Sequence, residues 1–212
     1  MRIVSLPLRS LLAHARPKRF ASGQLILYEG DESNEPMILT EGVVKVFHVD
    51  DKGQEKVLHL LRPPALLPLD CLRGNPQPVA WYYGALTDSE AGVLSLAELH
   101  AQLQTNPLLS IHLVHALALE SHELLVRINS MSKSEAKDRL VAALRFLEVY
   151  YSLPEKWGWK QIEFPVTHQL LADMTGITRE SATIQLHHLQ EQGIIRPKRP
   201  YIELHTQRLL DL

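Results

Sequence analysis

The sequence changes its pattern at Asn106-Pro107, and this change restricts the possible folds more than any other feature. Before it, runs rich in β-branched residues alternate with turn segments such as EGDESNEP and DDKGQ. After it, residues 108–131 contain neither Gly nor Pro, which permits one long helix. Strands followed by helices predict an α+β fold with two or more parts.

The N-terminal part has the pattern of a series of β-hairpins. The runs LILYEGD, MILTEGVVKVFHV and EKVLHLL show period-two alternation, and VAWYYGALTDSEAGVLS continues it after a proline-rich interruption. Together they predict an antiparallel, jelly-roll-like β-roll of about eight short strands. We assign residues 1–106 to this domain.

Along the long helix, apolar residues recur at alternating spacings of three and four, which is typical of a coiled-coil seam. The seam consists of Val114, Leu117, Leu124, Ile128 and Met131, with Ser121 among them. The stripe could pack on its own roll. A roll on one flank would leave the rest of so apolar a helix exposed, so we favour pairing with a second copy. Residues 107–135 are therefore expected to form a dimerisation helix and hinge.

The C-terminal part, residues 136–212, contains two short helical segments joined by a turn at Gly176. Thr167 and Thr178 stand where each helix would be capped, and Gly176 suits the left-handed position that ends the first. In the second helix Ala182 and Leu186 begin a buried stripe that Leu189 completes. Two helices joined in this way predict a helix-turn-helix unit, although an αα-corner with solvated charges is the alternative.

The opposite face of the second helix carries the candidate DNA-reading side chains. These are Arg179, Glu180, Thr183, Ile184 and His187. Downstream, IIRPKRPYIEL places Lys198 and Arg199 at a basic hairpin tip, where phosphates would run past a winged unit.

The order of β-roll, long helix and winged helix-turn-helix resembles the Crp/Fnr family of bacterial transcription regulators. The most specific pieces are LYEGD, ILTEGVVKVFHVDDKGQEKVLHLL, ALTDSEAGVLS and TGITRES. The resemblance implies a homodimer in which residues 1–106 of each subunit form an effector-sensing roll. It also implies that the dimer inserts two recognition helices into palindromic double-stranded DNA, with RNA polymerase as a further partner. It also implies that Arg179 and Glu180 match the Arg-Glu pair that contacts base edges and phosphates. Ile184 departs from the family, where a second Arg is common; it could cover a thymine methyl or pack within the domain.

The cyclic-nucleotide members of this family bind phosphate with a Gly-Glu helix start and an Arg-Ser or Arg-Thr pair. Amides and a guanidinium satisfy a buried anion. Here Leu69-Asp70 stands near the first position, and Val79-Ala80 or Pro78-Val79 replaces the second. Burying a phosphate without that cation costs on the order of several kcal/mol. We therefore expect no cyclic AMP binding, and we predict no cofactor.

A different effector would find its pocket among Leu69, Asp70, Arg73, Trp81 and Tyr83. Arg73 could replace the missing cation or be solvated on the surface. Trp81 and Tyr83 would share one face of an alternating strand, where core packing is the competing interpretation.

The chain has 11 histidines, and His112, His115 and His122 lie on adjacent turns of the long helix. That spacing could hold a metal or haem, so a haem or metal sensor of the same fold is an alternative. Histidines without ligation are the favoured interpretation, and we assign no metal residue.

Composition excludes several classes. The net charge is -2, but residues 136–212 carry 10 Lys and Arg against 9 Asp and Glu, while residues 1–135 carry 12 against 15, so an anion would bind in the C-terminal third. The lone Cys71 cannot form an internal disulfide. Arg9 interrupts the apolar start that a secretory signal peptide would need, and no apolar run is long enough to span a membrane. We therefore expect a cytoplasmic protein. Catalytic motifs are absent, and an enzyme is not predicted. The remaining alternative is a signalling module whose helix-turn-helix binds protein.

Overall fold

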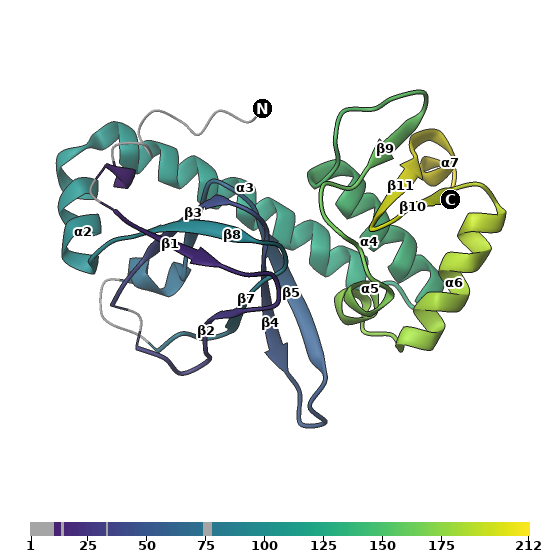
Figure 1. Ribbon diagram of the computed structural model, residues 1–212, viewed down its shortest axis with the longest axis horizontal. Helices are drawn as coiled ribbons and strands as arrows, with labels where there is room; N and C mark the ends of the chain where they lie inside the picture. The colour runs from purple at the N-terminus through teal and green to yellow at the C-terminus, as the bar shows by residue number, and fades with distance from the viewer. Residues whose placement is uncertain (1–10, 14, 33, 74–77) are drawn as a thin grey trace. The chain divides into compact units, whose positions relative to one another are not determined.

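The computed structural model describes residues 11–212 apart from 14, 33 and 74–77, and the chain divides into two compact units (Figure 1). The first unit comprises Met1–His48 and Leu58–His122, and the second comprises Val49–Val57 and Glu123–Leu212. The start of the chain, on which the expected absence of a signal peptide depends, lies outside the described residues. The division into residues 1–106, 107–135 and 136–212 stays a prediction.

The predicted antiparallel strands are present in the N-terminal half, where they form two four-stranded sheets (Figure 1). One sheet has the order β1 (Arg16–Phe20), β8 (Ser89–Val93), β3 (Met37–Glu41) and β6 (Ala65–Leu67). The other has the order β2 (Leu25–Leu27), β7 (Tyr82–Ala85), β4 (Val44–Val49) and β5 (Glu55–Leu61). Helices follow the strands along the chain, so the predicted α+β class is confirmed.

Strand β3 is buried on both faces, which explains why its sequence is apolar without alternation. Leu39 is 0% exposed and belongs to the cluster between the sheets, together with Val44 and Tyr83. Ile38 is 1% exposed and belongs to a second cluster, which it shares with Leu99 among others.

The connection from β3 to β4 is fixed by Gly42, whose φ of 85° lies in the left-handed region. A Cβ at this position would lie 2.7 Å from the Cα of Ser89, so no larger residue fits without backbone movement. The next residue is held by a hydrogen bond of 2.9 Å from the Val43 N–H to the Thr87 hydroxyl oxygen.

Two helices follow the roll: α2 (Leu96–Thr105) and α3 (Pro107–Met131). The Ser95 hydroxyl oxygen caps α2 by accepting the Glu98 N–H at 3.1 Å. Helix α3 has the bounds that the Gly- and Pro-free run predicted, and Leu109 in its first turn is buried in the second cluster.

The surface of α3 carries an unusual number of large exposed apolar side chains. Of the predicted seam, Val114 is 62% exposed, Ile128 is 64% and Met131 is 43%, while Leu117 and Leu124 are half-buried. Further exposed residues on the helix are Leu108, Ile111, Leu119 and Leu125. Much of the apolar surface of α3 is therefore uncovered within one chain.

The second unit contains the predicted helix-turn-helix and a three-stranded sheet with the order β10-β11-β9. Its elements are α4 (Ala136–Tyr150), β9 (Trp159–Gln161), α5 (His168–Thr175), α6 (Arg179–Glu191), β10 (Ile195–Lys198), β11 (Tyr201–His205) and α7 (Thr206–Leu210). Helix α4 supplies the centre of the core, because Leu140, Leu144 and Leu147, which share one helix face, are each 0% exposed.

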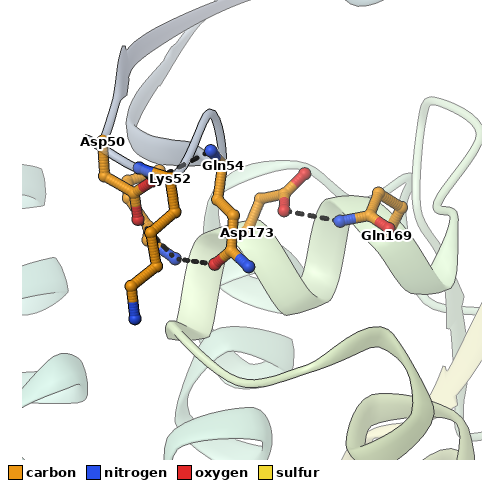
Figure 2. Close-up of polar contacts among 6 residues, drawn as sticks. Asp50, Lys52, Gln54, Gln169 and Asp173 are labelled. Atoms are coloured by element: carbon orange, nitrogen blue, oxygen red, sulfur yellow. Dashed lines mark hydrogen bonds and ion pairs between the residues drawn. The ribbon is translucent and has the colours of Figure 1, made fainter.

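A single buried arginine joins two segments of the second unit. Arg127 of α3 donates hydrogen bonds of 2.9 Å from Nη2 to the Val57 carbonyl and to the Met174 carbonyl at the end of α5. Figure 2 draws the turn that precedes Val57, where the Asp50 carboxylate accepts the N–H groups of Lys52 and Gln54. The segment of residues 49–57, which contains this turn, belongs to the same compact unit as α5.

Candidate nucleic-acid interface

The two helices α5 and α6 are held by local capping. The Thr167 hydroxyl oxygen accepts the Leu170 N–H at 3.0 Å, and that of Thr178 accepts the Ser181 N–H at 3.1 Å. Gly176 ends α5 with φ 65°, the left-handed conformation that sequence reasoning assigned to it. Each threonine uses an oxygen lone pair for its cap, so its hydroxyl proton remains to be donated.

Helix α6 buries one face and exposes the other. Ala182, Leu186 and Leu189 are buried, as their spacing predicted. The exposed face carries Arg179, Glu180, Ile184 and His187, with Thr183 half-buried among them. Because Arg179 is the first residue of α6, its guanidinium adds to the partial positive charge of the helix N-terminus.

Ile184 is 55% exposed, although it is an aliphatic residue on a short helix. The small cavity between α5, α6 and the wing is lined by Val166, His168, Leu171, Leu186, Gln190, Ile195, Pro197 and Ile202. Ile184 is not part of this lining, so most of its side chain faces outward.

Thr183 is held by a partner that sequence reasoning missed. His168 Nδ1 lies 2.8 Å from the Thr183 hydroxyl oxygen, which also donates to the Arg179 carbonyl at 2.9 Å. Although His168 is exposed, partial desolvation of its ring lowers its pKa, and the nearby charges of His187 and Arg179 lower it further. The neutral imidazole therefore predominates at pH 8.

The wing is the hairpin of β10 and β11. Its basic residues are not equally available, because Glu203 forms ion pairs with Arg196 and with Lys198, the latter at 3.1 Å. The hydrogen bond from Arg196 leads the causes that hold the pKa of the Glu203 carboxyl below its usual value. Arg199 lies exposed at the hairpin tip, whereas the charge of Lys198 is partly compensated.

In the roll, the candidate effector residues are divided between surface and interior. Leu69 and Asp70 are half-buried in the short 3-10 helix η1 (Leu69–Arg73), and exposed Arg73 pairs with Asp70 at 3.8 Å. Tyr83 is buried in the core, whereas Trp81 is 41% exposed. Burial, followed by the negative charge of Asp70, raises the pKa of the Tyr83 hydroxyl.

Val79 and Asp70 are the positions that the sequence comparison set against the phosphate-binding motifs. Val79 is 1% exposed. Burial raises the pKa of the neighbouring Cys71 thiol to about 12, and the negative charge of Asp70 contributes to this shift. The carboxylate of Asp70 would itself repel an anion bound beside it, and its ion pair with exposed Arg73 is long at 3.8 Å.

Of the three histidines on α3, His112 is half-buried, and His115 and His122 are exposed. Within the part of the chain that the structure describes, no group of three or more His, Cys, Asp or Glu side chains has a metal-holding arrangement. Every helix in that part is too short or too polar to cross a membrane.

The chain contains a β-roll followed, along the sequence, by a winged helix-turn-helix, and comparison with known proteins gives the same class. The family described as "Crp-like helix-turn-helix domain" matches residues 138–212, and the "Cyclic nucleotide-binding domain" matches residues 17–106. Among curated proteins, the chain is 27% identical to the Cyclic AMP receptor protein of Thermus thermophilus over 94% of this chain and 88% of that one. It is 26% identical to the Global nitrogen regulator of a Nostoc species, over 88% and 83%.

Solved structures agree. The transcriptional regulator TTHA1359 of the CRP/FNR family from Thermus thermophilus has a TM-score of 0.69 and 28% identity, covering 92% of this chain and 97% of that one. FixK2 from Bradyrhizobium japonicum has a TM-score of 0.77 at 18% identity, covering 93% and 96%, which shows the common fold. The chain belongs to the Crp/Fnr family of transcription regulators, as its sequence motifs predicted.

Proposed function

We propose that the protein is a sequence-specific regulator that binds a palindromic DNA site as a homodimer. The observation that carries the proposal is the outward face of α6, on which Arg179, Glu180 and Ile184 are exposed beside a basic hairpin tip. Arg can give two hydrogen bonds to guanine, and Glu can accept from the cytosine amino group. Thr167 and Thr178 add hydroxyl protons for phosphates at the two helix starts, and His187 extends the face by one turn.

For Ile184 we propose contact with a thymine methyl group. Its 55% exposure and its absence from the cavity lining both argue against the packing alternative. Ile184→Ala should lower the preference for thymine over uracil at one base pair. An unchanged ratio would assign Ile184 no role in base recognition.

The homodimer is supported by the exposed apolar surface of α3. Val114→Glu together with Ile128→Glu should convert a dimer of about twice 24.1 kDa into a monomer in sedimentation at micromolar concentration. Val149→Glu is the matched control, since Val149 is 60% exposed but lies on α4. A wild-type monomer, or a dimer that tolerates both substitutions, would refute this pairing.

For the roll we propose that no cyclic nucleotide binds, because Val79 and Asp70 stand where a phosphate needs a cation and amides. Calorimetric titration with cyclic AMP and cyclic GMP should give no heat of binding. A dissociation constant in the micromolar range would show that Arg73 or another donor completes the site. The cytoplasm as location and RNA polymerase as a further partner are part of the same proposal.

The decisive experiment is selection of binding sites from a random DNA pool. Two half-sites about one helical turn apart should be enriched. Arg179→Ala should remove a guanine preference of about 1–3 kcal/mol at one position. Arg199→Ala should weaken binding to all DNA sequences alike and reduce the dependence of affinity on salt concentration. Lys198→Ala should have a smaller effect, because Lys198 already pairs with Glu203.

Lys18→Ala is the control for these charge changes, since Lys18 is exposed on β1 and should leave the salt slope unchanged. If no motif is enriched by the purified dimer at low salt, the protein-binding alternative replaces DNA recognition.

A further inference from the structure

The contact between His168 and Thr183 restricts what the Thr183 hydroxyl can offer to a ligand. Thr183 has one hydroxyl proton, and its oxygen has two close polar neighbours, His168 Nδ1 at 2.8 Å and the Arg179 carbonyl at 2.9 Å. A carbonyl oxygen can only accept, so the hydroxyl proton is donated to Arg179. The remaining contact is then a hydrogen bond only if His168 carries a proton on Nδ1.

A neutral His168 with its proton on Nδ1 has an unprotonated Nε2, so these contacts fix the tautomer of the imidazole. The alternative, in which Thr183 donates to His168, would leave two oxygen atoms facing each other at 2.9 Å without a proton between them. Protonation of His168 would not change the outcome at Thr183, because Nδ1 carries a proton in the imidazolium as well.

The surroundings of His168 contain few charges. His187 and Arg179 approach from α6, and both disfavour the imidazolium. On the side of the wing, the cavity lining consists of Ile195, Pro197 and Ile202, none of which titrates. The neutral form is therefore the relevant one at pH 8.

With one lone pair occupied by His168 and the proton committed to Arg179, the half-buried Thr183 oxygen keeps a single lone pair. An unconstrained threonine can either donate to a base or accept from it. We propose that His168 is a positioning residue that fixes Thr183 as an acceptor only, so that Thr183 selects a base with an exocyclic amino group. In the major groove these bases are adenine, through N6, and cytosine, through N4. The inference rests on the proposed DNA binding and adds to it the rule for one base position.

The first test is direct and needs no variant. Nitrogen chemical shifts of the histidine rings at pH 8 distinguish the two tautomers, and His168 should carry its proton on Nδ1. His187 is the internal comparison on the same interface, and His168→Asn serves to assign the signal. A proton on Nε2 of His168 would overturn the proposal.

The second test measures base preference at each position of the selected DNA site. The wild-type protein should favour an amino-bearing base at one pair by about fivefold, which corresponds to one net hydrogen bond. Thr183→Val should remove the preference at that pair alone, and His168→Phe should do the same with Thr183 intact. His168→Asn should restore it, because the asparagine amide can place a donor near the position of Nδ1.

A purely structural role for His168 predicts a different pattern, namely equal loss at every position or an unchanged preference at all of them, and either result would refute the proposal. Thermal unfolding of each variant shows whether the fold is kept. If His168→Phe does not fold, the tautomer of His168 tests its role and the Thr183→Ser and Thr183→Val pair tests the hydroxyl: a proton on Nε2, or loss of the preference in the serine variant, would refute the proposal. A wild-type protein that enriches no site would refute the proposed function itself, whereas an enriched site that ignores His168 refutes only this inference.

Discussion

Arg127 offers a test of how burial, rather than hydrogen bonding, sets the contribution of an arginine to stability. Its side chain is 2% exposed, and only Nη2 has partners, the Val57 and Met174 carbonyls. Nε and Nη1 are buried without a hydrogen-bond partner among the described residues. Burial lowers the pKa of Arg127 to about 10, so the charge persists at neutral pH.

The magnitudes follow from these contacts. Arg127→Ala removes both hydrogen bonds, leaves two carbonyls unpaired and opens a cavity, which together should destabilise the protein by about 3 kcal/mol or more. Both substitutions also remove two unmet donors that each cost about 1–3 kcal/mol, but only Arg127→Met fills the volume, so for methionine the remaining balance is between the lost bonds and the removed donors. The two effects offset each other, so Arg127→Met should lie within about 1 kcal/mol of the wild type.

Urea unfolding followed by tryptophan fluorescence provides the measurement. Replacing Trp81 by Phe leaves Trp157 and Trp159, both in the second unit, as the reporters. Arg145→Ala is the matched control, because Arg145 also donates two hydrogen bonds to carbonyls, those of Leu209 and Leu210, but is half-exposed. It should cost about 1 kcal/mol.

Equal losses for Arg127→Ala and Arg127→Met would show that the hydrogen bonds outweigh the desolvation of the guanidinium. An Arg145→Ala variant as unstable as Arg127→Ala would show that burial does not distinguish the two arginines. Either result would refute the reasoning.

Three further predictions concern separate parts of the chain. With a pKa of about 12, Cys71 should react with iodoacetamide at pH 8 on the order of a thousandfold more slowly in the native protein than in urea, as followed by mass spectrometry; comparable rates would contradict its burial. Gly176→Ala should lower the free energy of unfolding by about 1 kcal/mol, purely from the left-handed backbone, since no atom lies within 4 Å of the added Cβ. Glu203→Gln should release the wing cations, strengthen binding to any DNA at low salt and steepen the salt slope by about 1; weaker binding would mean that the ion pairs are needed to shape the wing.

The features predicted well from the sequence are those that depend on neighbours within a few residues. The caps at Thr167 and Thr178 accept amide N–H groups three residues ahead. The left-handed conformation at position 176 depends only on the residue itself being glycine. The long helix 107–131 follows from the absence of helix-breaking residues between its ends. Each of these can be inferred without knowledge of tertiary packing.

The missed features depend on contacts across the fold. His168 and Thr183 are 15 residues apart, and only the crossing of α5 and α6 brings them together. Glu203 lies opposite Arg196, and this pairing depends on the register of a hairpin whose turn the sequence leaves open. A charge pattern could have suggested Glu203, because a lone acid on a basic hairpin commonly pairs across the strands. No local signal distinguishes the buried Arg127 from a solvated helix arginine.

Strand β3 has a consequence for how the roll finds its correct pairing. Where one face of a sheet contacts solvent, a shift of one residue in the register of a strand exposes its apolar side chains and is therefore unfavourable. In β3 both Ile38 and Leu39 enter apolar surroundings, so a slipped strand would bury nearly the same surface. The correct alignment must then be selected by the turn after β3. There the backbone of Ser89 packs too closely against Gly42 for a side chain, and the Thr87 hydroxyl oxygen accepts the Val43 N–H. Errors in that turn would therefore produce misaligned rolls that are compact, and not chains that fail to collapse.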